Sequence, residues 1–329
     1  MDMQAFDFVR QLAASHYLVR ALHVVADLGV ADQLGDRPTA SQLASRLDAD
    51  ADALRRVLTL LASRGVFRLD GDHIQHSNAS EFLRSDHPAS LRSFVRMFGQ
   101  QIQWQCAGDL QHAVRTGEAV ATRAFRGGLW GYFEENPTDG RIFGEAMVAK
   151  SAAQIADILA AHDFSPYRSI ADIGGGHGHM LRAILARHSA ATGLLFDLPA
   201  VIDEAKGAGD NSRLSFQSGD FFTTPLPQAD AMLLMEVLHD WDDAHCGAIL
   251  NAARLALGAA GRLLIIEIEM TEGSAPDWPK LLDIVMLTLF AARQRTNAEY
   301  ARLLQANGFR VERQTSTPGG VTIIEAMVA

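Results

Sequence analysis

The chain has 329 residues and a formal net charge of −10, with 48% hydrophobic and 21% charged residues. This length allows two domains of ordinary globular composition, and the negative charge argues against a general nucleic-acid or anionic-membrane binder. Two cysteines provide neither a disulfide framework nor metal-ligand spacing, so we expect no metal. The N-terminus shows no signal-peptide pattern and the most apolar stretch, 281–292, is too short to span a bilayer, which predicts a cytoplasmic protein.

The N-terminal quarter combines helical periodicity with a hairpin signal. Residues 1 to about 35 have the spacing of a helix with a wide apolar face, which favours an intertwined dimer. Two shorter helices follow, with candidate N-caps at 39–41 and 50–52. Residues 64–74 then predict a strand, an Asp-Gly turn and a second strand.

Helix, helix and hairpin in this order is a winged-helix pattern, which supports either DNA binding or a dimerisation module. Residues 1–100 contain 11 arginines, no lysine and 12 acidic residues. No basic face is evident, so we favour the dimerisation module.

Residues 88–165 are predicted to be mostly helical and are rich in aromatic side chains. Most of these side chains are expected in the core, and some could line an apolar ligand pocket, although their spacing does not indicate which. With a boundary near residue 160, we predict a winged-helix-like dimerisation domain at 1–95, a helical connector that contributes to an acceptor pocket at 96–160, and an α/β domain at 161–329.

From residue 168 onward, apolar runs alternate with helical patterns, which predicts a parallel, doubly wound sheet. The last two runs lie close enough in sequence to form an antiparallel hairpin. The predicted strands are 169–173, 193–196, 214–217, 231–235, 262–268, 309–313 and 321–326; helices are expected at 242–257, at 281–292 and from 297.

A glycine-rich turn follows the first of these strands and enters a helical pattern. Glycines at 174, 175, 176 and 178 allow backbone amides to approach a ligand closely. The dinucleotide fingerprint Gly-x-Gly-x-x-Gly fails, because His179 or Leu181 occupies the third position. Asp172 lies inside the motif, where a pyrophosphate would be repelled. A ligand with a cationic group fits better, and S-adenosylmethionine has an ammonium, a carboxylate and a sulfonium.

Two further acids follow the next two strands. Asp197 is placed to accept hydrogen bonds from both ribose hydroxyls, and Asp220 with Phe221 can bind and pack on adenine. For Asp172 and Asp220, turn formation is the competing interpretation. The order of acids at successive strand ends favours a ligand lying across the carboxyl ends of the strands.

The catalytic candidate is His239, which follows the strand at 231–235. Histidine suits removal of a phenolic proton because it titrates near working pH. The alternative is a capped helix start, with Asp240 or Asp242 as the N-cap and His239 as a loop residue. Trp241 packs either on adenine or in the core.

These motifs resemble those of bacterial small-molecule O-methyltransferases related to plant caffeate and isoflavone O-methyltransferases. The resemblance covers nearly the whole chain. It implies a seven-stranded, Rossmann-like class I methyltransferase domain at 161–329 that binds S-adenosylmethionine, and a homodimer formed through the N-terminal domain. It rests on four motifs: Asp172-Ile-Gly-Gly-Gly-His-Gly, Phe196-Asp197-Leu198-Pro199, Gly219-Asp220-Phe221-Phe222 and Leu238-His239-Asp240-Trp241-Asp242-Asp243.

The resemblance also implies a set of binding residues. At Met235 some members of the family carry a polar residue instead. The acceptor pocket would be lined by Asp283 and Met286. The implied cofactor-binding positions are Met147, Ser151, Asp172, Gly174, Gly176, Asp197, Leu198, Asp220, Phe221, Met235 and Trp241.

In this family His239 matches a catalytic base that two acids flank. Glu267 matches one of them. The other lies in a Gly-Gly-x-Glu-Arg-Thr-like segment, and this chain has Gln294 at that position. A glutamine can orient the imidazole but cannot offset an imidazolium charge. Either Glu267 suffices, or the acceptor is already acidic, or proton removal is not the chemistry.

We therefore predict methyl transfer from S-adenosylmethionine to a hydroxyl of an aromatic or polycyclic metabolite, with His239 as general base. One alternative is an enzyme of the same family that methylates nitrogen or carbon, or performs hydroxylation or rearrangement with the cofactor bound. The other is a winged-helix regulator that senses S-adenosylmethionine.

Overall fold

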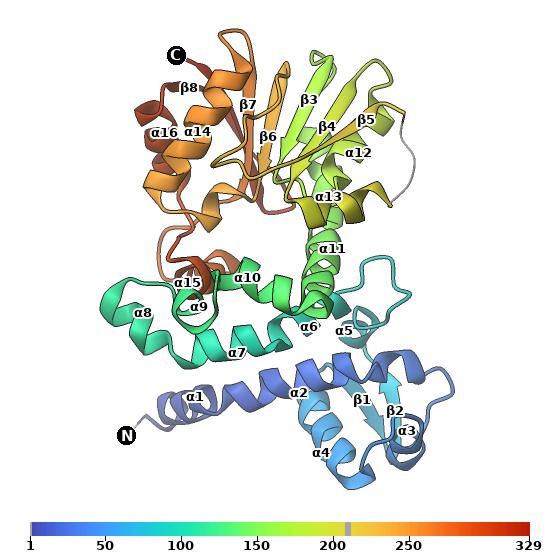
Figure 1. Ribbon diagram of the computed structural model, residues 1–329. Helices are drawn as coiled ribbons and strands as arrows, with labels where there is room; N and C mark the ends of the chain where they lie inside the picture. The colour runs from blue at the N-terminus through green and yellow to red at the C-terminus, as the bar shows by residue number, and fades with distance from the viewer. Residues whose placement is uncertain (1, 208–211) are drawn as a thin grey trace. The chain divides into compact units, whose positions relative to one another are not determined.

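The computed structural model describes residues 2–207 and 212–329 (Figure 1). The chain divides into two compact units. The first contains the residues up to Trp104 and Asn136–Lys150, and the second contains Gln105–Glu135 and Ser151–Ala329. Within the described residues, no helix combines the length and the apolar character needed to cross a membrane.

The first unit contains the predicted helices and hairpin. Thr39 and Asp50 are the N-caps of two successive helices, and each side chain accepts a hydrogen bond from a backbone amide. Its elements are α1 (Met3–Ala13), α2 (Ser15–Asp27), a 3-10 turn (Val30–Gln33), α3 (Ala40–Arg46), α4 (Ala51–Ala62), β1 (Phe67–Asp70), β2 (His73–His76), α5 (Asn78–Glu81) and α6 (Arg92–Gly99); α7 (Gln101–Gly108) and α11 (Pro137–Ala161) continue into the second unit.

The apolar periodicity of residues 1–35 belongs to two helices and not to one. The break falls at Ala14 alone, with φ of −97° and ψ of 1°, so the apolar spacing continues across it. No residue of α1 is buried against the described chain, and Phe6, Val9 and Leu12 are 52%, 63% and 60% exposed. The helix therefore presents an apolar face that this chain does not cover.

The second unit is built on a seven-stranded sheet with the order β5-β4-β3-β6-β7-β9-β8. β3 to β7 are parallel, and β9 runs antiparallel to both of its neighbours, as the predicted closing hairpin requires. The strands are β3 (Ser169–Ile173), β4 (Thr192–Asp197), β5 (Leu214–Ser218), β6 (Ala231–Met235), β7 (Arg262–Ile268), β8 (Phe309–Ser316) and β9 (Val321–Val328); the helices are α8 (Leu110–Thr116), α9 (Val120–Ala124), α10 (Gly128–Glu135), α12 (His179–Arg187), α13 (Pro199–Lys206), α14 (Asp243–Leu257), α15 (Trp278–Phe290) and α16 (Asn297–Ala306).

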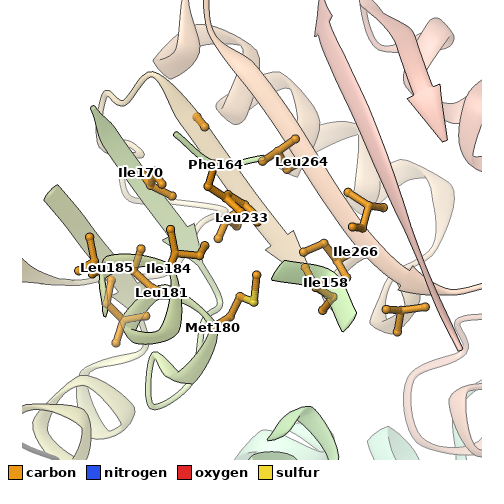
Figure 2. Close-up of a cluster of buried hydrophobic side chains, with 14 of the residues drawn as sticks. Ile158, Phe164, Ile170, Met180, Leu181, Ile184, Leu185, Leu233, Leu264 and Ile266 are labelled. Atoms are coloured by element: carbon orange, nitrogen blue, oxygen red, sulfur yellow. The ribbon is translucent and has the colours of Figure 1, made fainter. Parts of the chain in front are cut away.

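Two hydrophobic clusters cover the two faces of this sheet. On one face, Leu233 and Ile184 belong to a cluster that includes α11, α12 and α15 residues (Figure 2). On the other face, Leu234, Leu250 and Leu304 join the sheet to α14 and α16. Neighbouring residues of β6 thus point to opposite clusters, which explains why its sequence is apolar throughout. Each fully buried leucine contributes about 1.5–3 kcal/mol.

This topology brings the predicted site residues to one edge of the sheet. Because β3, β4, β6 and β7 are mutually parallel, their carboxyl ends lie along the same edge. Asp172, Asp197, Met235 and Glu267 are at or near those ends, as the sequence predicts.

Candidate active site

The glycine turn after β3 is shaped around Asp172. Gly174 and Gly176 have φ angles of 68° and 58°, in the left-handed region that glycine adopts easily. A Cβ on Gly175 would lie 2.5 Å from the Asp172 carboxyl carbon, whereas one on Gly176 would meet no atom within 4 Å. The turn therefore packs its backbone against the acid at Gly175 and leaves open space at Gly176.

Asp172 is a buried carboxyl group that lacks a full set of hydrogen-bond partners. Its exposed fraction is 1%, and its Oδ1 has no hydrogen-bond partner in the described structure. Burial, and secondarily the nearby Asp197, raise the pKa of Asp172 to about 7. A cationic ligand group would satisfy this oxygen and favour the ionised form, so the site fits the ammonium of S-adenosylmethionine.

Asp197 links β4 to the glycine turn. Its Oδ2 accepts from the Gly176 amide at 2.8 Å, and its Oδ1 accepts from the Leu198 amide at 2.7 Å. Burial raises the pKa of Asp197, and these two bonds oppose that rise. Each carboxylate oxygen can accept a second bond, so the predicted contact with ribose is compatible with this arrangement.

Asp220 begins a tight turn after β5. Its Oδ1 accepts from the Phe222 amide at 2.9 Å, which is the turn chemistry weighed against adenine binding. The Phe221 ring meets Trp241 edge-to-face with centroids 5.7 Å apart, and it also faces Gly174. The aromatic cluster therefore adjoins the glycine turn, and Trp241 is part of it.

His239 lies in a 3-10 turn, Leu238–Asp240, between β6 and α14, and its exposed fraction is 5%. The predicted helix start is also present, since Asp242 accepts from the His245 amide as the N-cap of α14. The Nδ1 atom of His239 lies 2.8 Å from Gln294 Nε2 and 3.6 Å from Glu267 Oε2. Its Nε2 atom lies 3.4 Å from Asp240 Oδ1. The structure thus brings together the three residues that the sequence associates with proton removal.

Glu267 holds the turn that carries His239. Its Oε1 accepts from the Leu238 and His239 amides at 2.9 and 3.3 Å, while Oε2 has no hydrogen-bond partner among the described residues. Burial raises the pKa of Glu267 well above its usual range, with further contributions from Glu236 and Asp240.

Gln294 is positioned by a residue that we expected in the acceptor pocket. The backbone amide of Gln294 donates to Asp283 Oδ1 at 2.8 Å, so Asp283 fixes the segment that carries the glutamine side chain. Met286 is buried in the cluster shown in Figure 2. The helix predicted at 281–292 instead ends at Phe290, because Ala291 adopts a left-handed conformation with φ of 54°. This reversal allows Gln294 to face His239.

Arg295 contacts the His239 turn, which the sequence reasoning missed. Its side chain is 1% exposed and donates to the Leu238 and Trp241 carbonyls at 2.9 and 2.8 Å, and to Asp243 at 2.7 Å. Cys246 donates to the Leu238 carbonyl at 3.2 Å. The only available signal was its place beside Gln294. Glu236 was also missed, because nothing in its surroundings in the sequence indicates its left-handed φ of 53° at the end of β6.

The remaining predicted cofactor residues lie on α11 and β6. Met147 belongs to the first unit, where it packs with Met97, Ile142 and Ala146. Ser151 is half-buried at the start of the second unit's share of α11. Met235 packs against the cluster shown in Figure 2. Their contacts with a cofactor remain predictions.

Comparison with known proteins identifies two family models that match this chain. An O-methyltransferase domain model matches residues 107–310, and an O-methyltransferase dimerisation domain model matches residues 10–83. The chain is 36% identical to phenazine O-methyltransferase PhzM from Lysobacter antibioticus, over 96% of this chain and 94% of that protein. It is 35% identical to the mitomycin biosynthesis 6-O-methyltransferase from Streptomyces lavendulae, over 98% and 94%.

A solved structure of a similar protein contains S-adenosylmethionine together with an aromatic acid. The O-methyltransferase NcsB1 of neocarzinostatin biosynthesis was crystallised with S-adenosylmethionine and 2-hydroxy-5-methyl naphthoic acid. It is 30% identical to this chain and superposes with a TM-score of 0.82, covering 95% of this chain and 96% of that one.

Proposed function

Because this chain belongs to the O-methyltransferase family, we propose that it transfers a methyl group from S-adenosylmethionine to a hydroxyl of an aromatic or polycyclic secondary metabolite. The similar proteins methylate phenazine and mitomycin compounds or bind a naphthoic acid. The observation that carries the proposal is the convergence of His239, Glu267 and Gln294 at the same sheet edge as the glycine turn.

Residues of the second unit would hold the cofactor at this edge. Asp172, with its partnerless Oδ1, suits the ammonium group, and Gly176 leaves space for close approach of the ligand. Asp197 suits the ribose, and Asp220 with Phe221 suits adenine. When bound, the cofactor supplies an electrophilic methyl group on its sulfonium. Much of the acceleration would come from holding the two reactants together, since good orientation alone contributes about 7–11 kcal/mol.

His239 is the proposed general base. The Nδ1 side of its ring faces Gln294 and Glu267, so Nε2 is the nitrogen that would receive the acceptor's hydroxyl proton. Arg295 and Glu267 hold the backbone of the turn from two sides. The ring is therefore fixed before the acceptor arrives, which is what positioned general-base catalysis requires.

The test begins with a thermal-shift screen of hydroxylated phenazines and naphthoic acids in the presence of S-adenosylhomocysteine. Any binder is then incubated with methyl-labelled S-adenosylmethionine, and label in an O-methyl product is the expected result. A binder that is converted without gaining label would contradict methyl transfer. Label on nitrogen or carbon would contradict the choice of oxygen.

The base assignment is tested with His239→Gln. We expect kcat/KM to fall by about 10²–10⁴, because the proton then has no positioned acceptor. The affinity for S-adenosylhomocysteine, measured by calorimetry, should stay unchanged as the control. Turnover within a few-fold of wild type would show that His239 is not the base.

We also infer that the protein is a homodimer formed through its N-terminal domain. The dimerisation domain match and the exposed apolar face of α1 support this. Light scattering should give twice the chain mass, and Val9→Glu combined with Leu12→Glu should give the monomer. Val114→Glu is the matched control, because Val114 is a 71% exposed valine on α8. A monomeric wild-type protein would contradict the inference.

A further inference from the structure

Gln294 stands where the similar family segment carries an acid, and its contact with His239 has a chemical consequence. The Gln294 amide nitrogen lies 2.8 Å from Nδ1, and both side chains are buried. An amide nitrogen only donates, so this bond makes Nδ1 the acceptor. The neutral imidazole then carries its proton on Nε2.

An imidazole protonated on Nε2 is not ready to act as a base there. To take a proton at Nε2, the ring must first move its own proton to Nδ1 and find an acceptor for it. The Gln294 carbonyl oxygen faces Nδ1 only after the amide rotates, because Nε2 now lies 2.8 Å from Nδ1. Oε1 instead lies where it has no hydrogen-bond partner in the described structure. Rotation would place the two amide hydrogens in that partnerless position, which is unfavourable for a buried group.

Two acids lie near the ring nitrogens. Glu267 Oε2 is 3.6 Å from Nδ1, and burial raises the pKa of Glu267, with the neighbouring Glu236 and Asp240 adding to that rise. Asp240 lies 3.4 Å from Nε2. Arg295 carries a positive charge at the Leu238 carbonyl of the same turn. A glutamate at 294 would add a carboxylate beside Nδ1, and the glutamine adds none.

We propose that Gln294 restricts this enzyme to acceptors whose aromatic hydroxyl is markedly more acidic than that of a simple phenol. Hydroxyls conjugated with a quinone carbonyl or with an electron-poor nitrogen heterocycle belong to this class. In the proton step, the acceptor O–H bond breaks and a bond from the proton to Nε2 forms, which leaves the ring as an imidazolium with Nδ1–H. Because Nε2 already carries a proton in the neutral ring, this step proceeds readily only when the hydroxyl releases its proton easily. The inference rests on the proposed methyl transfer to oxygen.

The first test reads the proton position directly and needs no acceptor. In ¹⁵N NMR of the complex with S-adenosylhomocysteine, wild-type His239 should have an unprotonated Nδ1. In Gln294→Glu it should have a protonated Nδ1, because the carboxylate accepts that proton. His239→Gln identifies the signals. A protonated Nδ1 in the neutral wild-type ring would overturn the proposal.

The second test compares acceptors that differ in acidity but hardly in size. 2-Naphthol and its ring-fluorinated derivatives serve as the series, because fluorine is close to hydrogen in size. Wild-type kcat/KM should rise at least about tenfold from the least to the most acidic member, and Gln294→Glu should reduce that rise several-fold. Equal dependence in both proteins would overturn the proposal while leaving methyl transfer intact. If Gln294→Glu also transfers no methyl group to any naphthol, with normal cofactor binding, Gln294 is not what restricts the acceptor, and methyl transfer itself is judged by the label experiment above.

A second variant covers the case in which a buried glutamate prevents folding. In Gln294→Met, the methionine side chain has a length similar to that of glutamine, but it does not donate a hydrogen bond and accepts only a weak one. It should abolish the preference for a proton on Nε2 and give an acidity dependence between those of the other two proteins. An unchanged NMR pattern in Gln294→Met would show that the glutamine does not set the proton position.

Discussion

Two strand-to-helix turns lie side by side at the carboxyl edge of the sheet, and they are built in opposite ways. The turn from β3 to α12 consists largely of glycine, and it encloses one carboxyl group whose Oδ1 has no partner in the described structure. The turn from β6 to α14 carries bulky side chains, and Glu267, Arg295 and Cys246 all bond to its backbone. The first leaves open space beside its backbone at Gly176, and the second holds one imidazole in place.

The two turns differ in where their polar atoms without hydrogen-bond partners lie. The glycine turn leaves a buried acid incompletely paired, which costs stability until a cation arrives. In the His239 turn, the Leu238 and His239 amides and the Leu238 and Trp241 carbonyls are all hydrogen-bonded, and the incomplete pairing lies in the neighbouring side chains Glu267 and Gln294.

Removing Arg295 should break the second turn and give the largest effect. In Arg295→Met, the Leu238 carbonyl loses its charged donor and the Trp241 carbonyl loses its bond to Arg295. We expect a loss of roughly 2–5 kcal/mol in unfolding free energy, because the Leu238 carbonyl is buried and the Trp241 carbonyl is partly buried. We also expect a fall in kcat/KM of about 10³ as His239 loses its position. Denaturation and steady-state kinetics measure the two.

Arg293→Met is the matched control for this change. Arg293 lies two residues away and is 52% exposed, with a surface ion pair to Glu299. Its loss should cost less than about 1 kcal/mol. If the two arginine variants lose equal unfolding free energy and equal kcat/KM, the hydrogen bonds from Arg295 are not what holds the His239 turn.

At the glycine turn, Asp172→Asn should stabilise the protein without cofactor in a pH-dependent manner. Because the pKa of Asp172 is raised from 3.8 to about 7, the folded state holds a proton that the unfolded state releases between these values. Wild-type stability therefore falls as pH rises from about 4 to 7. With each pKa unit worth about 1.4 kcal/mol, the variant should gain up to roughly 4 kcal/mol at pH 8 and little at pH 4.

The same variant should lose stabilisation by S-adenosylhomocysteine, because a neutral amide binds an ammonium group poorly. Thermal unfolding with and without this ligand at pH 8 measures both effects. A variant that is equally destabilised at pH 4 and pH 8 would show that Asp172 is a structural acid and not a ligand group.

Two alanine variants separate crowding from backbone strain in the glycine turn. A Cβ on Gly175 would lie 2.5 Å from the Asp172 carboxyl carbon and 2.6 Å from Leu195 Cδ1. Gly175→Ala should therefore cost about 1–3 kcal/mol by overpacking and weaken cofactor binding about tenfold by displacing Asp172. Gly176→Ala meets no atom within 4 Å but keeps a φ of 58°, so about 1–2 kcal/mol of strain is expected. Calorimetric titration would contradict the distinction if both variants lost equal affinity.

The sequence predicted the glycine turn much better than its counterpart. Apolar runs and glycine spacing are local signals, and they located β3, β6 and the acids at the strand ends correctly. The His239 turn depends on contacts between segments far apart in sequence, such as Arg295 with the Leu238 carbonyl. Asp283, which accepts from the backbone amide of Gln294, acts on that turn only through Gln294. Periodicity reports which face of an element is buried and carries no information on the partner, so Arg295 and the role of Asp283 were missed.

Helix ends show the same limit on a smaller scale. The apolar pattern through Ala292 continues past the real end of α15 at Phe290, because Ala292 is buried after the chain has already turned. The break at Ala14 is hidden for a related reason, since a single non-helical residue separates the two helices and apolar residues continue on both sides of it. Backbone reversals at non-glycine residues such as Ala291 leave no mark in composition.

Cys246→Ala should give the smallest effect, and it tests whether the Leu238 carbonyl depends on Arg295 alone or on Arg295 and Cys246 together. Its Sγ donates to the Leu238 carbonyl at 3.2 Å, but Arg295 donates to the same oxygen at 2.9 Å. Cys246→Ala should therefore cost only about 1 kcal/mol, mainly for the small cavity, and change kcat less than about twofold. If kcat instead falls tenfold with Arg295 intact, measured beside the Arg295→Met variant, the thiol and the guanidinium act together, and the turn is held by both.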